Sequence, residues 1–216
     1  MPVLAIAHRA GNSLAGLRTA NKLGVDVIEC DVHQFRGRLE VRHLKSAGPL
    51  PFLWDRWELA SASAPRLGLA ELLAADEHGT TFMLDLKGGR GTSVGRSVAS
   101  LLHEVGHHRD VLVCGRRWSS VDALAHLPYV RRVLSARNRV ELSRLVQRLP
   151  TQPTYGVSVH RSLLDPATVE ALHRHVEVVM TWPVNDVATL DRLLDIGVTG
   201  IISDEDEILA ELIGRR

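Results

Sequence analysis

Two spacings of hydrophobic residues alternate along the chain. Short runs rich in Val, Ile and Leu are typical of buried β-strands, and each is followed by a segment whose apolar residues recur at intervals of three and four. The short runs predict strands at Val3–Ala7, Val25–Val32, Thr81–Leu86, Val111–Cys114, Val130–Leu134, Tyr155–Val159, Val176–Trp182 and Gly200–Ser203.

The segments between these runs predict amphipathic helices. Asp165-Pro166 is typical of a helix cap followed by proline at the first helical position, and Ser203-Asp204 offers a cap for the last helix. The predicted helices are Leu14–Leu23, Val94–Val105, Val121–Leu127, Val140–Leu149, Pro166–His175, Val187–Leu194 and Asp206–Ile213.

Strand and helix alternate about eight times, which predicts a parallel sheet wrapped by helices. No linker or shift in composition divides the chain, so we expect one α/β domain over residues 1–216. Eight such units in this length favour a single-domain (β/α)8 barrel, the TIM-barrel architecture. A doubly wound open sheet is the structural alternative, but the first predicted strand lacks the GxGxxG turn of a dinucleotide-binding fold.

One irregularity follows the second predicted strand. Asp31 to His43 has the pattern of a β-hairpin that turns at Arg36-Gly37, and the turn would bring His43 back beside Asp31. Residues 44–67 then form the longest connection of the chain and include Trp54 and Trp57. Long loops in compact domains are usually functional, so we expect this segment to act as a lid or wall, or to be pinned by its tryptophans as a structural cover.

Composition narrows the class of protein. Hydrophobic residues make up 45% and charged residues 24% of the 216, as in an ordinary globular chain. The net charge is +1 and aromatics are 4%, which gives no support for a nucleic-acid partner. Cys30 and Cys114 cannot form a disulfide framework. The apolar run at the start is too short for a signal peptide, and no run reaches about 18 apolar residues, so a cytoplasmic location without stable membrane insertion is expected.

Chemically active side chains recur at the predicted strand ends, where (β/α)8 enzymes place their sites. The first strand ends in His8-Arg9. Glu29 and Asp31 are two apart in the second strand, as are Asp85 and Lys87 at the end of the third, so each pair leaves its strand on one face. Later strands end at His160 and at Trp182, with Asn185 just beyond.

These residue types suggest attack on a phosphodiester. Three carboxylates in one mouth repel each other unless a cation lies among them, and oxygen ligands favour Mg²⁺ or Ca²⁺. Arg9 and Lys87 could hold a phosphate, while His8 and His43 could exchange protons near neutral pH. Each motif alone is more often a solvated or structural pattern, but four strand ends carry such groups at once. His33 shares the face of Glu29 and is expected only to line the site.

The ordered blocks of the chain resemble the glycerophosphodiester phosphodiesterase family over nearly the whole length. The blocks are Ala7-His8-Arg9, Gly24 to Val32, the hairpin to His43, Leu84 to Lys87, Thr181 to Asn185 and Gly197 to Asp204. The resemblance implies a (β/α)8 barrel with a metal held by Glu29, Asp31 and Asp85. It also implies that His8 and His43 are the general acid and base and that Arg9 contacts phosphate. Lys87 matches a lysine that the family has two residues after its third metal ligand, and Trp182 matches an aromatic wall of the substrate pocket.

The chain departs from the family pattern at several positions. Ala10 replaces the glycine of the family's HRG motif, Leu44 follows the second histidine where the family has aspartate, and Pro183 replaces a threonine. Asp85 stands where the family usually has glutamate. The insertion after the second histidine is reduced to the segment around Pro49–Arg66, and this insertion helps the family select the alcohol.

The function expected from the sequence is hydrolysis of glycerophosphodiesters to glycerol 3-phosphate and an alcohol, with one divalent cation and a small-molecule substrate. The Asp-x-Lys block also resembles sphingomyelinase D-like phospholipases, so an enzyme that releases a cyclic phosphate is one alternative. A degenerate barrel that binds phosphate without turnover is another, suggested by the changes at Ala10 and Leu44. The leaving alcohol, the preferred metal, the roles of the two histidines and the oligomeric state stay open.

Overall fold

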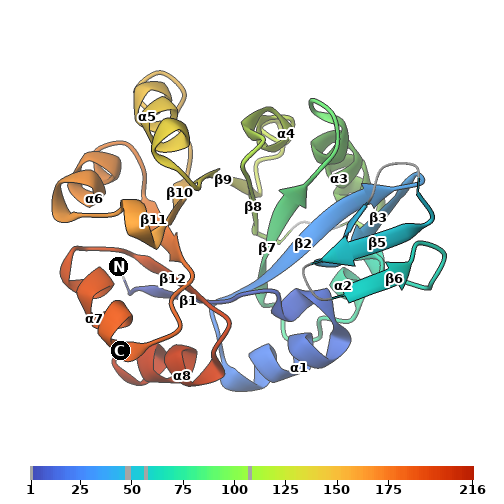
Figure 1. Ribbon diagram of the computed structural model, residues 1–216, viewed down its shortest axis with the longest axis horizontal. Helices are drawn as coiled ribbons and strands as arrows, with labels where there is room; N and C mark the ends of the chain where they lie inside the picture. The colour runs from blue at the N-terminus through green and yellow to red at the C-terminus, as the bar shows by residue number, and fades with distance from the viewer. Residues whose placement is uncertain (1, 47–49, 56–57, 107–108) are drawn as a thin grey trace.

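Eight parallel strands close into a barrel, as the alternation of elements predicts. The computed structural model describes residues 2–46, 50–55, 58–106 and 109–216. Pairing of β1 with both β12 and β2 closes the ring, which excludes the open sheet (Figure 1). In order round the barrel the strands are β1 (Leu4–Ala7), β2 (Val27–Phe35), β7 (Thr81–Lys87), β8 (Val111–Gly115), β9 (Val130–Ala136), β10 (Gly156–His160), β11 (Val178–Trp182) and β12 (Gly200–Ser203).

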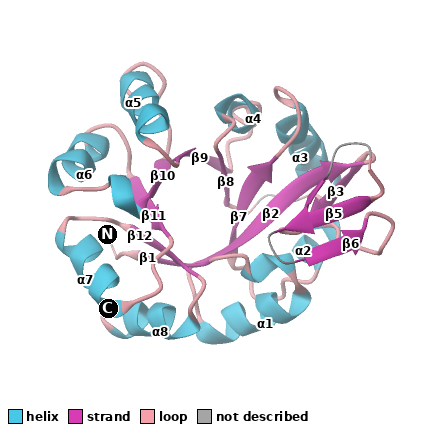
Figure 2. Cartoon of the chain, in the orientation of Figure 1, coloured by secondary structure: helices cyan, strands magenta, loops and turns pink. Residues whose placement is uncertain are grey.

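Helices surround this ring on its outer side (Figure 2). The side chain of Asp165 caps α6 with Pro166 in its first turn, as predicted, whereas the cap residue of α8 is Glu205 rather than Asp204. The helices are α1 (Leu14–Leu23), α2 (Leu69–Ala74), α3 (Ser93–Glu104), α4 (Trp118–Asp122), α5 (Arg139–Arg148), α6 (Pro166–His173), α7 (Val187–Asp195) and α8 (Asp206–Gly214), with 3-10 turns at Ala10–Asn12 (η1) and Arg161–Leu163 (η2).

Two of these helices differ from the sequence prediction. The prediction of a helix over Val121–Leu127 is wrong, because α4 begins earlier at Trp118 and is followed by turns after Asp122. The short helix α2 was not predicted, and it lies in the stretch that follows the long connection. Both are about one turn long, and at this length a three-to-four spacing of apolar residues does not fix the ends of a helix.

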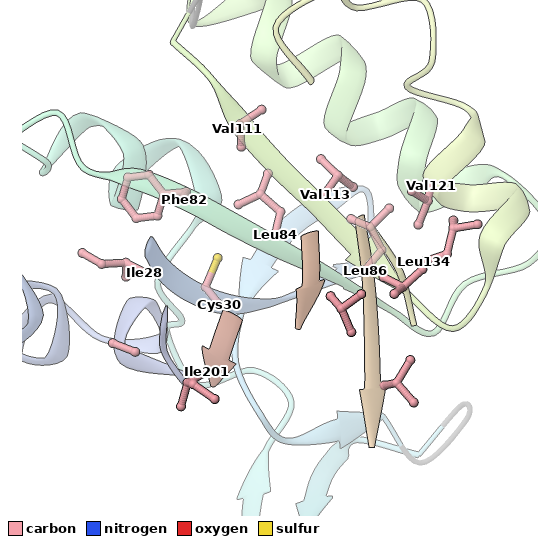
Figure 3. Packing of buried hydrophobic residues seen from close by; sticks show 14 of the residues in the cluster. Ile28, Cys30, Phe82, Leu84, Leu86, Val111, Val113, Val121, Leu134 and Ile201 are labelled. Atoms are coloured by element: carbon pink, nitrogen blue, oxygen red, sulfur yellow. The ribbon is translucent and has the colours of Figure 1, made fainter. Parts of the chain in front are cut away.

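Alternation along the strands divides the core into two layers. Outward-facing residues pack against the helices, as Figure 3 shows for Val113 beside Val121 of α4. Inward-facing residues fill the barrel and form a separate cluster: Ile6, Val27, Met83, Leu112, Cys114, Val133, Val178, Met180 and Ile202. Because strand side chains alternate, the residue two positions beyond an inward-facing one also faces inward.

The long connection is more ordered than predicted. The hairpin of β2 with β3 (Arg38–Val41) turns at Arg36 and Gly37, both with positive φ, as expected. The next segment then forms a small antiparallel sheet of β4 (Lys45–Ser46), β5 (Phe52–Asp55) and β6 (Glu58–Ser61). Leu53 is buried in this sheet, whereas Trp54 is 45% exposed on the opposite face. Trp57 lies outside the described residues.

Candidate active site

The inward-facing rows of the barrel end in polar residues at one mouth. Ile6 is followed on its row by His8, Val27 by Glu29 and Asp31, and Met83 by Asp85. The same rule places Lys87, Trp182 and Asp204 at the ends of their rows. The core therefore changes from apolar to mainly polar at the ends of these strands, and the predicted site residues of these rows come together there.

Three carboxylates converge beside β2 and β7. Asp31 and Asp85 are directly opposite each other in the parallel register, and Glu29 lies two residues before Asp31. One oxygen of each lies within 4.8 Å of the others, with Glu29 and Asp31 buried and Asp85 partly buried. The convergence predicted from the strand parity is confirmed. A set of three carboxylates suits a hard cation such as Mg²⁺ or Ca²⁺.

Crowding of these charges shifts their pKa values apart. Burial, together with the negative charge of Asp31, raises the pKa of Glu29 to about 8. Burial also opposes ionisation of Asp31, but its pKa is lowered because Lys87, Asn12 and Arg9 stabilise the carboxylate. The negative charge of Asp31 is therefore balanced by the protein alone, whereas that of Glu29 is not. A bound cation would supply the missing positive charge beside Glu29.

The two predicted phosphate-binding cations contact the carboxylates. The ammonium of Lys87 lies 2.9 Å from Asp31 Oδ1 and also hydrogen-bonds Asp85 Oδ2. The guanidinium Nε of Arg9 is 3.8 Å from Asp31 Oδ2, and the backbone N–H of Arg9 donates to Glu29 at 2.6 Å. Arg9 has φ of 56°, a left-handed conformation that turns this N–H onto Glu29. Both side chains are partly exposed and thus face the mouth as well as the acids.

Asn12 is a member of the site that the sequence analysis missed. Its side-chain amide donates to Asp31 Oδ2 at 2.9 Å, and its carbonyl accepts from the Asp31 backbone N–H at 2.8 Å. The turn η1 carries Asn12 back over β2, where Gly11 packs against Cys30 with no room for a Cβ. The sequence signal for this turn was the pair Gly11-Asn12 shortly after the first strand, because glycine and asparagine favour turns.

His8 is paired with Asp204, another residue without a predicted role in the chemistry. His8 Nδ1 lies 2.7 Å from Asp204 Oδ1, and Asn185 holds the other carboxylate oxygen and the Asp204 backbone N–H. Burial lowers the pKa of His8, but the hydrogen bond with Asp204 and the charges of Glu29 and Asp204 raise it by more. The same contact lowers the pKa of Asp204. Asp204, which is 196 positions away in the sequence, thus fixes the orientation of the His8 imidazole.

His43 has its own carboxylate from the small sheet. Its Nδ1 lies 2.6 Å from Asp55 Oδ2, and both side chains are about one-third exposed. The Arg42 backbone N–H donates to the Asp31 carbonyl at 3.0 Å, which brings the end of the hairpin back to the acidic cluster as predicted. Leu44 replaces the family's aspartate next to this histidine, and Asp55 supplies a carboxylate partner from a different strand.

An aromatic pair lies across the mouth. The rings of His160 and Trp182 meet edge to face with centroids 5.1 Å apart, at the ends of neighbouring strands β10 and β11. His33, in contrast, is buried, and burial with the nearby charge of Arg42 lowers its pKa to about 3. His33 therefore stays neutral, in keeping with the lining role expected for it.

The fold and the site define a (β/α)8 barrel with a carboxylate cluster and two carboxylate-paired histidines at its mouth. The model of the glycerophosphoryl diester phosphodiesterase family matches residues 94–207, more than half of the chain. The chain belongs to this family, whose members are phosphoric diester hydrolases. The matched residues include Trp182 and Asp204, whereas the three carboxylates, His8 and His43 lie before them.

Solved structures with this fold are similar over nearly their whole length. An Oleispira antarctica phosphodiesterase, solved with the product sn-glycerol-3-phosphate, is 18% identical with a TM-score of 0.77, covering 97% of this chain and 96% of that one. A glycerophosphodiester phosphodiesterase from Parabacteroides distasonis is 19% identical, with a TM-score of 0.74 and coverage of 100% and 99%. The Thermotoga maritima enzyme is 17% identical, with a TM-score of 0.74 and coverage of 98% and 99%. A search of curated proteins gave no match. At these identities the likeness shows the fold.

One further finding concerns membranes. Among the helices in the described part of the chain, none is long and apolar enough to cross a bilayer.

Proposed function

We propose that the chain hydrolyses glycerophosphodiesters to glycerol 3-phosphate and an alcohol, with one divalent cation. The observation that carries this proposal is the convergence of Glu29, Asp31 and Asp85 at a mouth where His8 and His43 each have a carboxylate partner. Family membership and the product bound to the Oleispira antarctica structure support the substrate class.

The three carboxylates would hold Mg²⁺ or Ca²⁺. When bound, the cation supplies Lewis-acid polarisation of the phosphate oxygens. Arg9 and Lys87 would add positive charge beside the phosphate and orient it, since each lies beside a different oxygen of Asp31 and is partly exposed. Trp182 would pack against the carbon skeleton of the substrate.

The two histidines would move the protons. One takes a proton from the attacking hydroxyl, either water or a neighbouring hydroxyl of the substrate, and the other gives a proton to the departing alkoxide. Asp204 and Asp55 would fix the ring orientation of His8 and His43 and stabilise each imidazolium. Attack by a substrate hydroxyl gives a cyclic phosphate that water can open.

Hydrolysis assays test the proposal directly. The purified chain, stripped of metal and then supplied with Mg²⁺ or Ca²⁺, should release glycerol 3-phosphate from glycerophosphodiesters. His8→Ala and His43→Ala should each lower kcat by about 10²–10⁴ and leave the circular dichroism spectrum unchanged. A cyclic phosphate as the final product would instead favour the sphingomyelinase D-like alternative. Tight phosphate binding without turnover would favour a non-catalytic barrel.

A further inference from the structure

Two arginines at the same mouth have no part in this hydrolysis. Arg116 is the first residue after β8, and Arg137 is the first residue after β9. Cys114 and Val133 face the barrel interior, so Arg116 and, two steps further, Arg137 continue inward-facing rows. Strands β8 and β9 lie between β7, which carries Asp85, and β10, which ends at His160 (Figure 1).

Charge interactions connect the two arginines with the carboxylates on one side and the aromatic pair on the other. The pKa of Arg116 is raised, first by its hydrogen bond to Glu141 and also by the charge of Asp85. The pKa of His160 is lowered by burial and by the positive charges of Arg161 and Arg137. The charge of Arg116 thus interacts with Asp85 of the acidic cluster, and that of Arg137 interacts with the ring that packs on Trp182.

Glu141 joins the two loops that carry these arginines. Arg116 Nε donates to both carboxylate oxygens of Glu141, at 3.1 and 3.2 Å, and the Arg137 backbone N–H donates to one of them at 2.7 Å. The Glu141 backbone N–H in turn donates to Asn138, which caps α5. A helix start therefore fixes the spacing between the loops after β8 and β9.

The charge at this part of the mouth is only partly balanced. Glu141 is paired with Arg116, and its pKa is lowered first by that hydrogen bond and also by the charges of both Arg116 and Arg137. Among the described residues, the exposed side chain of Arg137 makes no salt bridge of 4.0 Å or less, so one carboxylate faces two guanidinium groups. At the opposite end of the barrel, Arg131 and Arg132 are paired with Asp110 and Asp122. The chain as a whole carries a net charge of only +1, so this local excess does not follow from a basic composition.

Besides the carboxylate cluster and Glu141, two further acidic groups lie on the other side of the mouth, after β11 and β12. Asp186 caps α7, and Asp204 is held by His8 and Asn185. A substrate with its diester phosphate at the carboxylate cluster can therefore extend in two directions of different charge. Along β8 and β9 it meets guanidinium groups, which bind phosphate through paired, charge-assisted hydrogen bonds.

We propose that Arg116 and Arg137 bind a second phosphate carried by the alcohol of the substrate, so that the preferred diesters have a phosphorylated alcohol. This inference rests on the proposed function, because it names a substrate class for that same site. Glu141 is a positioning residue in this arrangement, since it acts through Arg116 and the loop of Arg137.

A matched pair of substrates tests the inference. Glycerophosphoinositol and glycerophosphoinositol 4-phosphate differ by one phosphate, and kcat/KM should favour the phosphorylated diester by about tenfold at low salt. The preference should decrease as ionic strength rises, because the arginines are exposed. In the double variant Arg116→Gln/Arg137→Gln the ratio of kcat/KM for the two substrates should fall to near unity, because KM for the phosphorylated diester rises. The double variant Arg116→Lys/Arg137→Lys should retain part of the preference.

Arg131→Gln is the matched control. This variant also removes an arginine ion pair, that of Arg131 in β9 with Asp110 just before β8. Because this pair lies at the opposite end of the barrel, the preference for the phosphorylated diester should be unchanged. If both substrates are cleaved at equal kcat/KM, the inference is overturned and the proposed function stands. If neither is cleaved, the proposed function fails, and calorimetric titration with the same two compounds decides the inference. Equal affinity would overturn it, and tighter binding of the phosphorylated compound that the Gln variants lose would support it.

Discussion

His8 and His43 are each oriented by a carboxylate from another segment of the chain. Asp204 reaches His8 from the end of β12, and Asp55 reaches His43 from β5. A carboxylate on one ring nitrogen fixes the tautomer and leaves the other nitrogen free for proton transfer. In the proposed mechanism the acid-base pair therefore depends on four residues.

Asp204→Asn should lower the pKa of His8. The hydrogen bond and charge of Asp204 raise this pKa, so the contact favours the protonated ring. By linkage, its stabilisation is fully present below pH 6.5, the ordinary value, and is lost as pH rises through the higher folded value. NMR titration of the His8 ring in the metal-free protein measures the change. An unchanged pKa would mean that Asp204 does not set the charge state of His8.

At the scale of elements, short segments placed outside the barrel adjust its mouth. The small sheet β4-β5-β6 presents alternate faces, with Leu53 buried and Asp55 on His43, while Trp54 lies on the other face beside Lys45. Strand alternation thus separates Asp55, which contacts His43, from the tryptophan expected to select the alcohol. Any effect of Trp54 on specificity would come from the outer side of this sheet.

Asp55→Asn should lower kcat with little change in KM. The carboxylate stabilises and orients His43, and an amide cannot balance an imidazolium charge. We expect a loss of about 10-fold to 10²-fold, smaller than for removal of the histidine itself. Trp54→Ala is the comparison on the same strand, and its exposed side chain predicts little change in Tm. Equal kinetic effects of both variants would contradict the division of the two faces.

Gly95→Ala should destabilise the contact of α3 with α4. A Cβ on Gly95 would lie 1.9 Å from the Ser120 carbonyl oxygen, and the Gly95 backbone N–H already donates to Ser120 Oγ at 2.9 Å. Because backbone has to move, we expect a loss of about 1–3 kcal/mol in the free energy of unfolding. Gly214→Ala in α8 meets nothing within 4 Å and serves as the control in the same denaturation series.

At the scale of the whole molecule, the barrel concentrates charge at one end of its axis. The interior is apolar up to the last inward-facing layer and becomes acidic within two residues. Burying Glu29 beside Asp31 opposes folding of the metal-free chain, since it raises the pKa of Glu29 to about 8. A site that binds a cation well is thus costly without one.

Glu29→Gln should stabilise the metal-free protein at high pH and abolish its response to metal. A raised carboxyl pKa means that the folded state binds more protons, so wild-type stability falls between about pH 4.5 and 8, and the variant lacks this fall. Mg²⁺ or Ca²⁺ should raise the Tm of the wild type alone, because a ligand that binds only the folded state stabilises it. Thermal melts at pH 5 and pH 9, with and without metal, check both effects. Equal stabilisation of the variant by metal would remove Glu29 from the site.

The sequence by itself determined the barrel and the acidic half of its mouth. Alternation of strand and helix is a local pattern that recurs at short range, and the two-residue spacings of Glu29 with Asp31 and Asp85 with Lys87 fix shared faces without further information. The hairpin at Arg36-Gly37 is equally local. These features could be predicted because each depends on neighbours in the chain.

Only the tertiary structure decided which side chains contact His8, His43 and Asp31. Asp204, Asp55 and Asn12 join the site through contacts across 196, 12 and 19 positions. Only Asn12 has a local signal, the glycine beside it, and this signal indicates a turn rather than a partner for Asp31. Closure of β1 onto β12 brings Asp204 to His8. The small sheet was missed because its strands are short and gain stability from one another and from packing on the barrel, not from a repeating pattern.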